Sequence, residues 1–244
     1  MELKHELSTL SLLKLISFLF WSGLYLQWAV DSEHSPEYSS RVVTLLHGLV
    51  ASCVGLAQCG VKTFSPSCLT LTLTWSQYAL MTWSWGYFAF DLLWCLIYWT
   101  KNYTMMCHHF SALAAINLYI SKQNGGCIFA CTIALLEITN PLLQTRWFLR
   151  DAGHSNTILY YVVEFTYLIM FISLRGFLGT YLVYKIIKSE TFGVYEKLIT
   201  FALYFVSLIF IYEIFGYVLH KYRYKIEEFR GFGNEPVFTL QEQE

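Results

Sequence analysis

Two adjacent histidines, His108 and His109, stand within the apolar stretch MMCHHFSALAAI that covers residues 105–116. Imidazole gains and loses a proton near neutral pH, and it also binds metals and forms hydrogen bonds. Successive positions of a helix point about 100° apart, so one ring can face the interior while the other meets a neighbouring helix. The pair therefore favours a functional site. The structural alternative is that each histidine bonds a backbone carbonyl of an adjacent helix.

Other ionisable side chains also fall within apolar stretches, where a charge near the centre of a membrane helix costs about 2.5–3.5 kcal/mol on insertion scales. With a rise of about 1.5 Å per residue, most of them lie roughly 5–14 Å below one membrane face. A common depth predicts one shared site rather than scattered structural groups. These residues are His47, Asp91, Glu137, Glu164 and Glu213, together with the histidine pair, and Arg175 is a further ionisable residue in such a stretch.

Three chemistries could use the histidine pair. In acyl transfer, an imidazole acts as base or nucleophile and a carboxylate sets its tautomer. In metal binding, Asp91 and Glu137 join the histidines as ligands. In a lipid headgroup site, the same groups form hydrogen bonds without turnover. The chain has no HxxHH or HExxH pattern, so metal binding is the least favoured of the three and no metal is expected. It also lacks the G-x-S-x-G pattern of a serine nucleophile.

The composition is that of a membrane protein. Hydrophobic residues make up 56% of the 244 residues, charged residues only 14%, and the mean hydropathy is +0.45. A soluble core of this size cannot bury so many long apolar runs, so lipid must be the solvent. The formal net charge of −1 gives no reason to expect a nucleic-acid partner. Cysteines in apolar stretches usually act as small hydrophobes, so neither a disulfide nor a metal site is inferred from them.

Apolar segments of roughly the 17–25 residues that a bilayer requires follow one another along the chain. The first is interpreted as a retained signal anchor, and the turn sequence KQNGG at 122–126 separates the fourth from the fifth. The sequence therefore predicts an all-α membrane protein with seven transmembrane helices and short connectors, one of them at 144–157. The segments cover residues 7–30, 42–60, 78–100, 105–121, 125–143, 158–184 and 198–220.

Lysines and arginines near the segment ends favour an N-terminus in the lumen or outside the cell and a cytosolic C-terminus. In that orientation more basic residues face the cytosol than the opposite side. The cytosolic set is Arg41, Lys101, Arg146, Arg150, Lys221, Arg223, Lys225 and Arg230, and the opposite set is Lys4, Lys62, Lys122, Lys185, Lys188 and Lys197.

Several motifs together resemble the TLC-domain family, whose members include TRAM proteins and ceramide synthases. The motifs are the HH pair, GYFAFD at 86–91, LLEITNPLLQTRWFLRDAGH at 135–154 and RVVTLLHG at 41–48. The resemblance implies that residues 41–220 form a TLC domain, six of the seven helices making a bundle around a polar cavity. Residues 1–40 are then the signal-anchor helix and first loop, and 221–244 a polar tail. The resemblance also implies the endoplasmic reticulum membrane.

The segment after the histidine pair departs from the pattern of ceramide synthases. In those proteins an H-D-x-S-D segment and the paired histidines are needed to transfer an acyl group from acyl-CoA to a sphingoid amine. Here Glu137 stands in place of the first aspartate and Asn140 in place of the second. Asparagine cannot act as a base, which disfavours synthase chemistry. Pro141 removes a helical hydrogen bond and predicts a kink that opens a polar patch.

We therefore expect a protein that binds membrane lipid and influences membrane lipid composition without synthase turnover. The alternative is an acyltransferase with acyl-CoA as co-substrate, and no other cofactor is expected. His47 and Glu164 are expected to line one cavity with the histidine pair, and this cavity should open towards the face that bears Arg41, Arg146 and Arg150. The acyltransferase would use His108, His109, Asp91 and Glu137, whereas lipid headgroup binding would use His47, Asn140, Glu164, Arg41 and Arg146.

Overall fold

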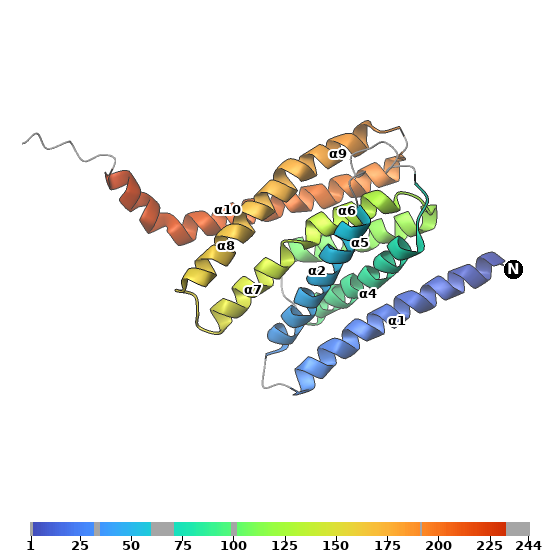
Figure 1. Cartoon of the computed structure of the whole chain (residues 1–244), viewed down its shortest axis with the longest axis horizontal. Coiled ribbons are helices and arrows are strands. Elements are labelled where there is room, and N and C mark those ends of the chain that lie inside the picture. The colour runs from blue at the N-terminus through green and yellow to red at the C-terminus, as the bar shows by residue number, and fades with distance from the viewer. Residues whose placement is uncertain (1, 32–34, 60–70, 99–101, 191, 233–244) are drawn as a thin grey trace, which may run out of the picture.

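The computed structural model describes residues 2–31, 35–59, 71–98, 102–190 and 192–232, and this part of the chain is almost entirely helical (Figure 1). The segment η2 is π-helical and joins α8 to α9. The elements are α1 (Glu2–Asp31), α2 (Pro36–Cys59), α4 (Trp75–Ile97), α5 (Tyr103–Lys122), α6 (Gly126–Glu137), α7 (Asn140–Asp151), α8 (Ile158–Phe171), η2 (Ile172–Leu178), α9 (Gly179–Lys188) and α10 (Val194–Phe232).

Six of the described stretches are long and apolar enough to cross a membrane: α1, α2, α4, α6 with α7, α8 to α9, and α10. The twenty-residue α5 packs against α4 and α10, and at 1.5 Å per residue it extends about 30 Å. Figure 1 shows α1 at one edge of the bundle, beside α4, and α8 to α9 at the other edge with α10. The all-α membrane fold is therefore confirmed, and α5 supplies the seventh helix within the described residues.

The outer surface of the bundle is apolar. Along α1, for example, Leu15, Ile16 and Leu19 are each at least half exposed, and on α10 Leu198 and Phe201 are similarly open. Water would penalise such a surface, whereas lipid tails solvate it without cost. The polar side chains instead turn towards the interior, where neighbouring helices can satisfy them.

Helix α2 packs closely on α6 and α7 through glycines. A Cβ at Gly55 would lie 2.9 Å from the carbonyl oxygen of Ala130, and a Cβ at Gly48 would lie 3.0 Å from the Cβ of Asn140. Small residues allow membrane helices to approach each other in this way. The close approach also brings together Cys59 of α2 and Cys131 of α6, 72 residues apart in the sequence, in a disulfide that the sequence alone does not indicate.

The fifth apolar segment is broken into two helices. Helix α6 ends at Glu137 and α7 begins at Asn140, with Pro141 in the first turn of α7, where a missing N–H is tolerated. Helix α7 then continues to Asp151, so the connector predicted at 144–157 is wrong over residues 144–151. The polar run QTRWFLRD resembles a loop in sequence, but Gln144 and Arg146 line an internal cavity.

Candidate functional site

A polar cavity of about 910 Å³ lies inside the bundle. Residues of α2, α4, α5, α6, α7, α8, η2 and α10 line it, so most of the helices contribute to one space. The ionisable and amide side chains in its wall are Glu37, Arg41, Asp91, Asn102, His108, His109, Glu137, Asn140, Gln144, Arg146, Arg175 and Glu213. The intramembrane polar residues at a common depth are therefore largely gathered around one cavity.

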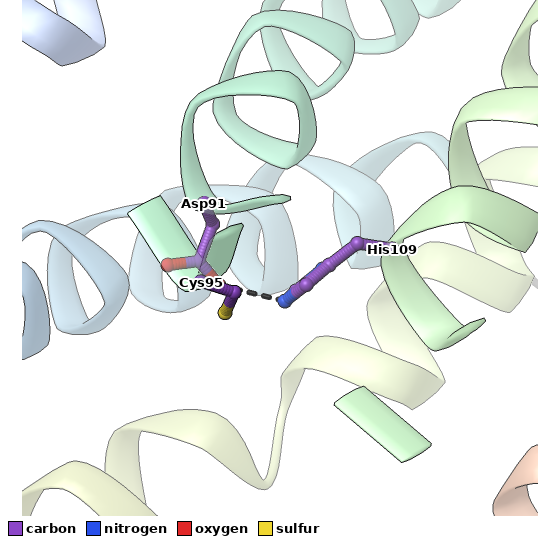
Figure 2. A group of neighbouring side chains, drawn as sticks. All are labelled: Asp91, Cys95 and His109. Carbon is purple, nitrogen blue, oxygen red and sulfur yellow. Dashed lines mark ion pairs between the residues drawn. The ribbon is translucent and has the colours of Figure 1, made fainter. Parts of the chain in front are cut away.

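His109 and Asp91 face each other across this cavity wall (Figure 2). Nε2 of His109 lies 2.7 Å from Oδ2 of Asp91, and both side chains are buried. The contact is close but poorly aligned for a hydrogen bond, since neither ring nitrogen of His109 has a hydrogen-bond partner among the described residues.

The same corner contains a third group that could bind a metal. Sγ of Cys95, one turn after Asp91 on α4, lies within 4.8 Å of the donor atoms of Asp91 and His109. Figure 2 shows these three side chains directed towards one another. Two ligands held at about 2.0–2.1 Å on a tetrahedral zinc are about 3.3 Å apart. Because the His109 to Asp91 contact of 2.7 Å is shorter than that, the arrangement fits an ion pair better than a preformed zinc site.

His108 points away from this pair. Its ring meets the edge of Phe210 on α10, with ring centroids 5.9 Å apart, and its Nδ1 atom has no hydrogen-bond partner within the described chain. Adjacent helical positions diverge, as expected for successive residues of α5. His108 thus offers an imidazole to the cavity, while His109 is held by Asp91.

Glu137 is buried at the break between α6 and α7. Nδ2 of Asn140 donates to its Oε2 at 2.6 Å, and Nδ1 of His47 lies 3.5 Å from the same oxygen. His47 is fully buried and stacks on Tyr87, with ring centroids 3.8 Å apart. His47 is absent from the cavity wall, contrary to expectation, because its position on α2 places it one layer behind Glu137. His47 contacts Glu137, so it can orient that carboxylate.

Glu164 also lies outside the cavity wall, which contradicts the expectation for this residue. Only 1% of it is exposed, and cations and hydroxyls surround its carboxylate. It is the centre of a network that ties α8 to α7 and α10, and it is therefore a structural group. Its contacts are Arg146 at 2.8 Å, Lys221 at 2.6 Å, Tyr222 at 2.6 Å, Tyr217 at 2.7 Å and Tyr160 at 3.3 Å.

Basic side chains lie at one end of the cavity. Arg41, near the start of α2, donates from Nη2 to Oε1 of Glu37 at 2.8 Å and from Nη1 to Oε1 of Gln144 at 3.1 Å. Its guanidinium lies over the ring of Trp147. Arg146 lines the cavity while bound to Glu164, but the exposed Arg150 does not line it. Two of the three expected arginines therefore reach the cavity.

A second, apolar pocket of about 110 Å³ adjoins the first. Side chains of α5, α6, α9 and α10 form most of its wall, including Ile116, Leu182 and Leu203. The two spaces share part of their lining, so the polar cavity and the apolar pocket meet at one level of the bundle. The shared residues are Phe88, His108, Glu137 and Arg175.

Arg175 is the residue of this site to which the sequence gives no role. It lies in the π-helical segment η2, is buried, and donates from Nη2 to the carbonyl oxygen of Leu136 at 2.7 Å. Its position within an apolar span could have identified it as a site residue, because an arginine in such a span is costly and usually has a function.

Comparison with known proteins finds a family model and related proteins. A TLC-domain family model matches residues 37–222. TLC domain-containing protein 4 A of Dictyostelium discoideum is 28% identical over 169 residues, which is 66% of this chain and 62% of that protein. The chain thus matches less than two thirds of the length of this relative. No solved structure matches.

Proposed function

Because the chain belongs to the TLC-domain family, we propose that it binds a membrane lipid and influences membrane lipid composition without synthase turnover. The observation that carries the proposal is the meeting of a polar cavity with an apolar pocket at His108, Glu137 and Arg175. An amphiphile needs both environments, because its head requires hydrogen-bond partners and its chain requires apolar surface. The lipid head occupies the polar cavity, and an acyl chain occupies the apolar pocket.

The groups around the histidines support binding rather than synthesis. Glu137 is engaged by Asn140 and His47, and no carboxylate of the described residues forms an ion pair with His108. A general base in acyl transfer needs a partner that fixes its tautomer. The one carboxylate-paired imidazole of the cavity wall is His109, whose contact with Asp91 is misaligned.

Incubation of the purified protein with labelled acyl-CoA and long-chain amines separates binding from turnover. We expect bound label without an acylated amine, because the second carboxylate of the synthase pattern is replaced by Asn140. The matched controls are His108→Ala and His109→Ala, which should leave the product level at background. An acylated product that forms with the wild-type protein and disappears in either variant would overturn the binding proposal in favour of acyl-CoA-dependent acyl transfer.

We also propose that the mouth of the polar cavity faces the cytosol. Arg41 lies near the start of α2, whereas Cys59 lies at its other end and is disulfide-bonded to Cys131. Disulfides persist in oxidising compartments, which supports a position of the Cys59 end at the lumen or the exterior. The balance of basic residues favours the same orientation, and the family favours the endoplasmic reticulum as the membrane.

Terminal tags in sealed microsomes test this orientation. We expect protease to remove a C-terminal tag and to spare an N-terminal tag until detergent is added, because α1 crosses the membrane before α2 begins. A lumenal marker protein that stays intact before detergent confirms that the vesicles are sealed. Protection of the C-terminal tag would reverse the orientation.

A further inference from the structure

Arg175 has more hydrogen-bonding capacity than its surroundings use. Its Nη2 atom donates to the carbonyl oxygen of Leu136 at 2.7 Å, and its guanidinium lies 4.5 Å from the ring centroid of Phe171. Its Nε and Nη1 atoms are buried and have no hydrogen-bond partner among the described residues. Only 6% of the residue is exposed. Two donors of a permanently charged group are therefore unsatisfied inside the bundle.

No carboxylate of the described residues forms an ion pair with Arg175. Glu137 lines the same junction and acts on this charge from a distance, but its close contacts are with Asn140 and His47. Buried charges in membrane proteins are paired, and an unpaired guanidinium is strongly disfavoured. An anion that enters the cavity would compensate this charge and accept from Nη1, which carries two unsatisfied N–H bonds, and such charge-assisted hydrogen bonds are stronger than neutral ones.

The local backbone fixes Arg175 at the level where the two spaces meet. Residues 172–178 are π-helical, and π-helical turns occur frequently at functional sites because they change the direction of a side chain. Arg175 belongs to the walls of both the polar cavity and the apolar pocket. An anionic group bound there would have its attached chain directed into the apolar pocket.

We propose that Arg175 is the anion-binding residue for a single-chain amphiphile whose carboxylate or phosphate lies at the junction of the two spaces. The apolar pocket is small, at about 110 Å³ against about 910 Å³ for the polar cavity, which leaves room for one chain at most. This inference rests on the proposed lipid binding and names the chemistry that selects the lipid. Nη1 donates to the anion, while Nη2 stays on Leu136 and holds the guanidinium in place.

Binding competition in nanodiscs of neutral phosphatidylcholine tests the charge requirement. The probes are palmitate, 1-palmitoyl lysophosphatidic acid and hexadecanol, which share one chain length and differ in the head. With the wild-type protein, we expect either palmitate or lysophosphatidic acid to bind at least about tenfold more tightly than hexadecanol. The ratio of palmitate to lysophosphatidic acid assigns the anion to a carboxylate or a phosphate.

Two substitutions distinguish the role of the guanidinium shape from that of its positive charge. Arg175→Gln should remove the preference for the anion, and Arg175→Lys should weaken anion binding because an ammonium has a single nitrogen, which cannot stay on Leu136 while a second nitrogen meets the anion. Hexadecanol binding should change less than about twofold in both variants, within the scatter of such comparisons. The control is Arg150→Gln, which removes an exposed arginine outside both cavities and should preserve the anion preference.

The outcomes are distinguishable. Equal wild-type affinity for palmitate, lysophosphatidic acid and hexadecanol would overturn the role of Arg175 while leaving lipid binding intact. Failure of all three probes to bind would overturn the proposed function as well. If Arg175→Gln does not fold, the wild-type comparison of the probes and the Arg175→Lys variant still decide the matter.

Discussion

Replacement of Glu164 with alanine is expected to lower the free energy of unfolding by about 3 kcal/mol. The carboxylate is buried and is contacted by Arg146 and Lys221 as well as by three tyrosine hydroxyls. Its removal leaves two cations facing each other without compensation. The side chains of these cations are 16% and 26% exposed, so water recovers part of the loss and the lower end of the range for buried pairs applies.

Thermal unfolding of the protein in nanodiscs measures this effect. The matched control is Glu213→Ala, because Glu213 is an exposed carboxylate on α10 that accepts a hydrogen bond from the hydroxyl of Thr104. We expect the control to lose less than about 1 kcal/mol. Equal stability of Glu164→Ala and Glu213→Ala would mean that the Glu164 network does not hold α7, α8 and α10 together.

Gly179→Leu is expected to reduce binding of long-chain amphiphiles by at least about tenfold. Gly179 lies at the start of α9 and lines the apolar pocket. A Cβ at this position would meet the ring of Tyr204, another residue of the pocket wall, at 3.8 Å, which is ordinary contact. The backbone therefore accepts a side chain, but the remaining atoms of leucine must enter the pocket and displace the acyl chain.

Gly176→Leu provides the control on the same continuous helix. A Cβ at Gly176 would meet Ile211 at 3.7 Å, and Gly176 lines neither of the two spaces. Both variants add the same side chain within three residues of each other, but only the one at Gly179 enters the pocket, so a difference between them reports on the pocket. Binding should change less than about twofold in Gly176→Leu. Equal affinity for hexadecanol in the two variants would show that the chain does not occupy the apolar pocket.

The sequence predicts well which residues carry polar atoms into the bundle. It predicts the partners of those residues less well. Apolar segment lengths are sufficient for the all-α membrane fold, since lipid leaves few other ways to satisfy the backbone. The common depth of Asp91, His109 and Glu137 also locates the cavity level, because depth follows from a residue count along each helix. The Cys59 to Cys131 disulfide depends on which faces of α2 and α6 meet, and the residue count does not contain that rotation.

The same missing rotation explains the two displaced site residues. His47 is at the right depth, but its helix face turns it onto Tyr87 and behind Glu137. Glu164 is likewise at the right depth, but its face meets Lys221 of α10, whose charge makes a structural pair. Arg175 is the reverse case, since the sequence gives it no role and yet it lines the cavity. It lies in the π-helical segment of an apolar span, where a buried arginine is costly.

Mass spectrometry of the lipid that co-purifies with the protein tests lipid binding most directly. After exchange into a mild detergent, we expect the wild-type protein and Gly176→Leu to retain about one acyl-chain amphiphile per chain, because the paired spaces remove its chain from detergent. Gly179→Leu should retain at least about tenfold less. Equal amounts of acyl lipid on Gly179→Leu and on the wild-type protein, or none on either, would contradict the binding of a lipid in the paired spaces.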